Sequence, residues 1–264
     1  MKKKLLQYTN VCWQLFRSDL VVFRQFIVED LINLFTWFSS FLIVFAYVYP
    51  ELGMFKEFGE FMVFSLIAAE SYWRIWPSCF ELINDLNGDK VINYYFTLPA
   101  PFWLVFVKTI LFHIFKSIIF CCFTLSLGIV ILWNKINWSN FSTIKFILIF
   151  LTISLFTGCF FIFLSSFAKN IKNVRKIGIR IILPLWFFGS GEFPWKTIYS
   201  NLSPKLAYIL LANPLTYAME GIHSATLGNT QFLPFWLCLT TLLLFSGFFG
   251  IIGILKLKKR LDTL

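Results

Sequence analysis

The chain has 264 residues, of which 58% are hydrophobic and 14% are charged, against about 45–50% and about 25% in an average soluble domain. A soluble globule, a disordered chain and a disulfide scaffold are excluded, because none of them could keep so much apolar surface from water. The net charge of +10 comes from short basic clusters between apolar runs. No continuous basic face is present, so nucleic-acid binding is not indicated. The composition indicates a polytopic membrane protein.

The first 30 residues carry apolar side chains at helical spacing, with polar and basic residues largely between them. The apolar edge consists of Trp13, Phe16, Leu20, Phe23 and Ile27. This pattern favours an amphipathic helix that lies in the headgroup layer. The alternative is an ordinary helix packed against the bundle.

Six apolar runs follow, and a membrane-crossing helix needs about 20 predominantly apolar residues. They are Leu31–Tyr49, Gly59–Trp76, Phe102–Trp133, Phe146–Ala168, residues 174–188 and Phe232–Leu257. The third run is longer than a bilayer requires, so we expect its first turns, with Lys108, His113 and Lys116, to project into the cytosol. The fifth is marginal because Pro184 interrupts it.

The distribution of Lys and Arg predicts the orientation of these spans. With six spans, sixteen of the 23 basic residues fall on the side of the two termini and five on the other side. Arg74 and Lys116 lie within spans. Since cytoplasmic loops carry the excess of Lys and Arg, both termini are predicted to be cytoplasmic, in the cell membrane (the inner membrane where there are two).

The second span contains an acidic and a basic residue, Glu70 and Arg74, four positions apart. This spacing places them on one helix face, where they can pair. Ionisable groups at membrane depth usually face the bundle interior or water. We therefore interpret the pair as part of a translocation path or subunit interface. The alternative is that Arg74 extends to the membrane surface and satisfies Glu70 on the way.

Two of the connections between the predicted spans contain apolar segments that suggest short helices. Residues 77–101 contain a short amphipathic helix, Phe80–Asn87, broken by Gly88. It is suited to docking on a partner, or it is a mere connector between spans. The outer connection, residues 189–231, has 43 residues, and loops beyond about 12–15 residues are often functional. Its short apolar helices broken by Pro are typical of segments that dip back into the bundle.

Several stretches resemble the ABC-2-type permease family, the membrane subunits of ATP-binding-cassette exporters. In the second half they are Leu164–Lys169, Leu183–Pro194 and Leu211–Gly228, the last containing Asn213-Pro-Leu-Thr-Tyr217 and Glu220. In the first half they are Leu86–Gly88, Phe96–Pro99 and Lys108. The resemblance covers most of the chain.

The resemblance implies an all-α polytopic fold with six transmembrane helices in one permease domain, residues 1–264. An interfacial helix would lie within residues 1–30, a coupling segment at 77–101 and re-entrant outer helices within 189–231, between spans five and six. The residues implied to dock on the ATPase are Asn84, Asp85, Leu86, Asn87, Gly88, Asp89 and Lys90. The outer re-entrant signature is Asn213, Pro214, Tyr217 and Glu220.

The sequence lacks the phosphate-binding motif G-x-x-x-x-G-K-[ST]. We therefore expect no catalytic residues, cofactor or metal on this chain, with ATP and Mg²⁺ held by a separate ATPase subunit. A second permease chain, in a homo- or heterodimer, would complete the path. The function predicted is export of a substrate driven by that ATPase. The alternative is an independent secondary transporter or channel. A membrane-embedded enzyme is disfavoured because His113 and His223 are predicted on opposite sides of the membrane.

Overall fold

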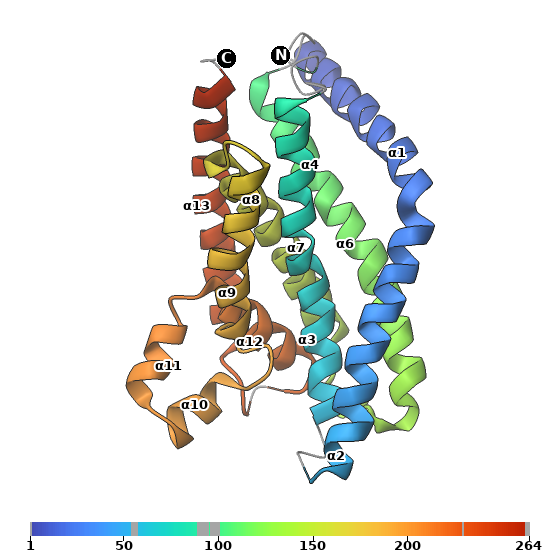
Figure 1. Cartoon of the computed structure of the whole chain (residues 1–264), viewed down its shortest axis with the longest axis vertical. Helices are drawn as coiled ribbons and strands as arrows, with labels where there is room; N and C mark the ends of the chain where they lie inside the picture. The colour runs from blue at the N-terminus through green and yellow to red at the C-terminus, as the bar shows by residue number, and fades with distance from the viewer. Residues whose placement is uncertain (1, 54–57, 89–94, 96–100, 229, 262–264) are drawn as a thin grey trace.

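The computed structural model describes residues 2–53, 58–88, 95, 101–228 and 230–261, and every regular element in these ranges is helical. Among the described residues, four helices are long and apolar enough to cross a membrane, within Gln7–Glu51, Phe102–Leu132, Thr143–Phe167 and Phe235–Arg260. The predicted all-α class, with several helices suited to a membrane, is confirmed. Figure 1 shows the helices side by side along one long axis. We call the end where α1 begins and α13 ends the terminal end, and the opposite end, where α2 lies, the far end.

The chain starts with a single long helix, α1 (Lys2–Ile43). It continues through a π-helical turn, η1 (Val44–Val48), into α2 (Tyr49–Glu51). Neither Gly nor Pro occurs before Pro50, so nothing in the sequence breaks the helix. The amphipathic segment is therefore continuous with the first span. Its aromatic edge packs on α6, where the Phe16 and Phe23 rings meet aromatic rings at centroid distances of 5.5–6.0 Å.

Two helices in succession return to the terminal end, α3 (Phe58–Trp73) and α4 (Ile75–Asn87). Nearly all of α3 is buried, which makes it a central element of the bundle. The predicted helix end at Gly88 is confirmed. However, the helix begins at Ile75 rather than Phe80, because Pro77 lies in its first turn, where the missing N–H would have no intrahelical partner. The helix does not project on its own, since Cys79, Ile83 and Leu86 are buried and α4 packs on α7 and α8.

The next two long helices form a hairpin. Helix α6 (Phe102–Leu132) runs to the far end, and two short 3₁₀ turns, η2 (Trp133–Lys135) and η3 (Trp138–Asn140), lead into α7 (Thr143–Phe167). The third predicted span is thus one helix. Helix α7 contacts α3, α4, α6, α12 and α13 and is mostly buried, as its uniformly apolar sequence predicts.

The last third of the chain combines short helices with one long one. Helix α8 (Ile171–Ile177), the π-turn η4 (Gly178–Ile182) and α9 (Leu183–Phe187) form a run from the terminal end. Helices α10 (Trp195–Asn201), α11 (Pro204–Leu210) and α12 (Pro214–Thr226) follow toward the far end, and α13 (Phe235–Leu261) returns. The short helices predicted in the outer connection are therefore present.

Candidate functional site

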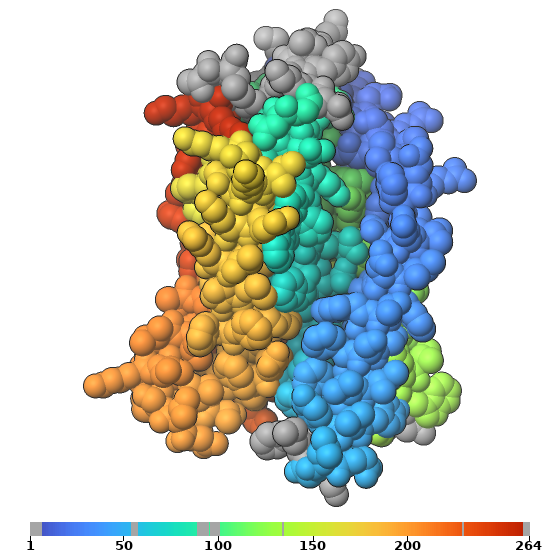
Figure 2. Space-filling model, viewed as in Figure 1, coloured from blue at the N-terminus to red at the C-terminus, as the bar shows by residue number. Residues whose placement is uncertain are grey.

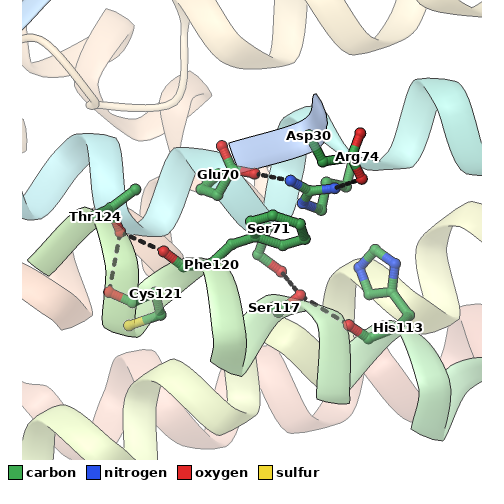
Figure 3. Close-up of polar contacts among 9 residues, drawn as sticks. All are labelled: Asp30, Glu70, Ser71, Arg74, His113, Ser117, Phe120, Cys121 and Thr124. Atoms are coloured by element: carbon green, nitrogen blue, oxygen red, sulfur yellow. Dashed lines mark hydrogen bonds and ion pairs between the residues drawn. The ribbon is translucent and has the colours of Figure 1, made fainter. Parts of the chain in front are cut away.

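An ion-pair cluster lies where α1, α3 and α6 meet, with Arg74 between two carboxylates (Figure 3). Its Nη2 atom is 2.6 Å from Glu70 Oε1, and its Nη1 atom is 3.8 Å from Asp30 Oδ2. The guanidinium carbon is 3.3 Å from the centroid of the Phe120 ring, so the cation also stacks on α6. The predicted pairing of Glu70 with Arg74 is formed. Asp30 and Phe120 complete the cluster from two other helices.

Burial makes the partners in this cluster depend on one another. The side chains of Glu70 and Arg74 are 9% and 17% exposed, whereas that of Asp30 is 40% exposed. An ion left alone in such surroundings is costly, since neither water nor a counter-ion solvates it. Arg74 therefore contributes mainly by neutralising Glu70, and Asp30 adds a weaker, partly solvated contact.

A network of hydroxyl groups ties α3, α6 and α7 together next to the cluster. Ser71 Oγ lies 3.1 Å from Ser117 Oγ and 2.7 Å from Thr157 Oγ1. His113 Nε2 lies 3.1 Å from the same Thr157 oxygen, and Figure 3 shows His113 and Ser117 one turn apart on α6. Hydrogen bonds between helices in an apolar bundle contribute about 0.6 kcal/mol each on average. The network therefore fixes how these three helices face one another.

A cavity of about 660 Å³ adjoins the cluster; we call it the α1–α4–α6 cavity after the helices that line it. Figure 2 shows it as a hollow between α1 and α4, with α6 behind. Asp30 belongs to both the cavity wall and the ion-pair cluster. The cavity is thus continuous with the ion-pair cluster through Asp30.

Lys108 also lines this cavity and corrects one expectation. It is only 4% exposed, and its Nζ donates a hydrogen bond of 2.7 Å to Asp19 Oδ2 of α1. Its Nζ also lies 5.0 Å from the centroid of the Tyr95 ring. The prediction that the first turns of α6 project into solvent is wrong at this position, because the first half of α1 covers them.

The predicted outer signature begins with a helix cap. Asn213 Oδ1 accepts a hydrogen bond of 2.9 Å from the N–H of Leu215, and Pro214 occupies the first helical position. This is a favoured start for a helix, because the side-chain oxygen satisfies a backbone donor that has no intrahelical partner. The Asn213 Nδ2 group donates to the Leu185 carbonyl at 2.7 Å, which ties α12 to α9.

Glu220 is fully buried and holds two segments to α12. Its two carboxylate oxygens accept hydrogen bonds from the backbone N–H groups of Trp195, at 2.6 Å, and Leu233, at 2.8 Å. These donors mark the start of α10 and the approach to α13. Tyr217 is half-buried, and its ring centroid lies 6.4 Å from that of Phe245 in α13. The signature residues thus organise the outer connection.

One residue of this region was not predicted as a contact. His223 is fully buried, with its Nε2 atom 2.9 Å from Ser65 Oγ and 3.2 Å from the Phe61 carbonyl oxygen. Its ring stacks on that of Phe61 at a centroid distance of 4.0 Å. His223 therefore anchors α12 to α3. Nothing in the local sequence indicates this, since the partners lie about 160 positions away.

The residues predicted to dock on a partner lie at the end of α4. Those described are Asn84, Asp85, Leu86, Asn87 and Gly88, whereas Asp89 and Lys90 lie outside the described residues. Leu86 is buried in the bundle, and Asn84, Asn87 and Gly88 are exposed. The Asn87 Nδ2 group donates to the Lys169 carbonyl oxygen at 3.3 Å, in the turn between α7 and α8. The exposed end of α4 is thus supported by the neighbouring turn.

Comparison with models of known protein families finds no match to this chain, and comparison with curated proteins finds none either. Membership of the family that the sequence resembles therefore stays a prediction. Among the described residues, no group of three His, Cys, Asp or Glu side chains is arranged to hold a metal ion. What the arrangement offers chemically is a partly polar cavity with fixed charges inside a helical bundle suited to a membrane.

Proposed function

We propose that this chain is the permease subunit of an ATP-binding-cassette exporter and forms the path through which cargo crosses the membrane. The observation that carries the proposal is the α1–α4–α6 cavity, with the Glu70–Arg74–Asp30 cluster at its side, in a bundle of membrane-length apolar helices. Charged groups at such depth are expensive and usually mark the route of a substrate or ion.

Six membrane passes are proposed from the four long helices and two composite runs. The run α3–α4 connects the two ends of the bundle, and the run α8–η4–α9 lies beside the long helices from the terminal half to the level of α12 (Figure 1). Basic residues gather toward the terminal end, in α8 and the turn before it and in the last turns of α13. This distribution supports cytoplasmic termini in the cell membrane.

The outer connection is proposed to contain the re-entrant part of the permease. Helix α12 is too short to span a bilayer, with 13 residues, yet nearly all of it is buried against α3, α7 and α13. The Glu220 hydrogen bonds support a role in which this segment closes the outer side of the path.

The energy for transport is proposed to come from a separate ATPase subunit that holds ATP and Mg²⁺. The exposed end of α4, with Asn84, Asn87 and Gly88, would be its contact. A second permease chain would complete the path. When the ATPase pair binds ATP and closes, it would move α4, and the cavity would open to each side of the membrane in turn.

Co-purification tests the proposal. The tagged chain, extracted in mild detergent, should retain an ATPase subunit, and Asp85→Lys/Asp89→Lys should release it. Glu192→Lys, which changes an exposed carboxylate of the outer connection, is the matched control and should retain the ATPase. Retention by the double variant, or no ATPase with the unchanged chain, would contradict the proposal.

The second candidate is an independent secondary transporter or channel. The partly buried ion-pair cluster favours it, because such clusters also occur in ion-coupled carriers. Reconstitution distinguishes the two functions. Transport in liposomes driven by an ion gradient, with no ATPase present, would establish the second candidate and exclude the first.

A further inference from the structure

The wall of the α1–α4–α6 cavity is acidic in a chain that is basic overall. Five of the 13 Asp and Glu residues of the chain line it, in contrast to two of the 23 Lys and Arg residues. The acidic ones are Asp19, Glu29, Asp30, Glu81 and Asp85, and the basic ones are Lys108 and Lys116. The negative charge is thus concentrated around one space, on the facing sides of α1 and α4.

The basic groups at and beside the cavity already contact other side chains of the bundle. Lys108 pairs with Asp19, Arg74 pairs with Glu70 and reaches Asp30, and Lys116 lies over aromatic rings. Among the described residues, no basic group lies within ion-pair distance of Glu29 on α1 or Glu81 on α4. Two carboxylates from opposite walls are therefore available to a charge from outside the chain.

Five of the twelve remaining lining residues are Phe or Tyr, whose ring faces accept cations. Lys116 Nζ lies 5.4 Å from the centroid of Phe23 and 5.0 Å from that of Phe112, and both rings line the cavity. Phe26 and Phe161 add apolar surface. Rings and carboxylates together are the lining with which proteins recognise organic ammonium-type ions. The volume of about 660 Å³ falls within the range of small-molecule sites, about 300–1,000 Å³, and far exceeds what a bare metal ion needs.

We propose that the α1–α4–α6 cavity binds a monovalent organic cation with a bulky apolar body, with its charge between Glu29 and Glu81 and its body against the Phe23, Phe26 and Phe112 rings. The inference that this cation is transported rests on the proposed function. The inference that the cavity binds it is independent of that function. Because the cavity lies in the half of the bundle toward the terminal end, a cation in that leaflet would reach it from the side.

Two probe ions of the same shape and opposite charge test the proposal. Tetraphenylphosphonium and tetraphenylborate are compared by equilibrium dialysis against the full-length chain in neutral detergent, without ATPase or nucleotide. We expect saturable binding of the phosphonium ion and at least tenfold weaker binding of the borate ion. Glu29→Gln/Glu81→Gln should weaken phosphonium binding about tenfold. Glu51→Gln, an exposed carboxylate at the end of α2 outside the cavity, should leave it unchanged.

Three outcomes would overturn the proposal: equal affinity for the two ions, which indicates apolar partition only; no saturable binding of the phosphonium ion; or an unchanged Kd in the double variant. The comparison of the two ions uses the unaltered protein, so it does not depend on how well a variant folds. Because the assay contains no ATPase, its failure leaves the export proposal open, and loss of the ATPase in co-purification leaves the binding result standing.

Discussion

The Glu70–Arg74 pair leads to a quantitative prediction about stability. Arg74→Met removes the cation 2.6 Å from Glu70 and leaves a carboxylate whose side chain is only 9% exposed. Breaking a buried pair by removing one partner costs about 3–5 kcal/mol. Because Arg74 itself is 17% exposed and its contact with Asp30 is long, we expect the lower end, about 3 kcal/mol of unfolding free energy.

Four buried cysteines provide the assay. A maleimide dye that fluoresces on reaction reports unfolding as these thiols become accessible on heating: Cys79, Cys121, Cys159 and Cys238. For a chain of this size, about 3 kcal/mol corresponds to a decrease in Tm of roughly 6–12 °C. Arg24→Met, which removes an exposed arginine of α1, should change Tm by no more than about 2 °C.

The double variant Glu70→Met/Arg74→Met separates pairing from packing. Replacing both partners by apolar side chains of similar length removes the stranded charge, so the double variant should recover to within about 1 kcal/mol of the unaltered chain. If Arg74→Met is no more harmful than Arg24→Met, or if the double variant is as unstable as Arg74→Met alone, the cluster does not depend on charge pairing.

Three further predictions concern other parts of the bundle. Glu220→Ala should cost about 3 kcal/mol and accelerate hydrogen exchange at the two N–H groups it binds, since hydrogen bonds to a charged group contribute about 1.5–3 kcal/mol each; unchanged exchange would contradict this role. In a background without native cysteines, Asn87→Cys should react with an impermeant maleimide only from the cytoplasm and Ser200→Cys only from outside, and the reverse pattern would exclude the proposed orientation. Gly178→Ala should lower Tm, because an added Cβ overlaps the Trp76 indole, and it should lower Tm less in a Trp76→Ala background, where the indole is absent; a Tm unaffected by Gly178→Ala would show that the contact is loose.

Local sequence was sufficient to predict several structural elements. The uninterrupted apolar run from Phe102 predicts α6 to within one residue at its end, and Gly88 ends α4 as expected. The short helices expected in the outer connection are present, and Asn213 and Pro214 cap α12 through contacts with adjacent residues only. The Glu70–Arg74 pair follows from helical spacing alone.

Contacts between segments far apart in the sequence could not be predicted from local patterns. Asp30 and Phe120 complete the ion-pair cluster from 44 and 46 positions away from Arg74, and no local pattern links them. The burial of Lys108 depends on Asp19, which the sequence placed in a separate interfacial helix. The acidic cavity could not be predicted either. Its carboxylates come from α1 and α4, and they lie around one cavity only after these helices pack together.

The length of α1 has a mechanical consequence. With 42 residues, it measures about 63 Å, since each residue adds about 1.5 Å. No Gly or Pro interrupts it, Figure 1 shows it bent part-way along its length, and its first departure from α-helical hydrogen bonding is η1 near the far end. Helices α1, η1 and α2 therefore form one continuous path from the Asp19 contact to the far end, with no other helix in between.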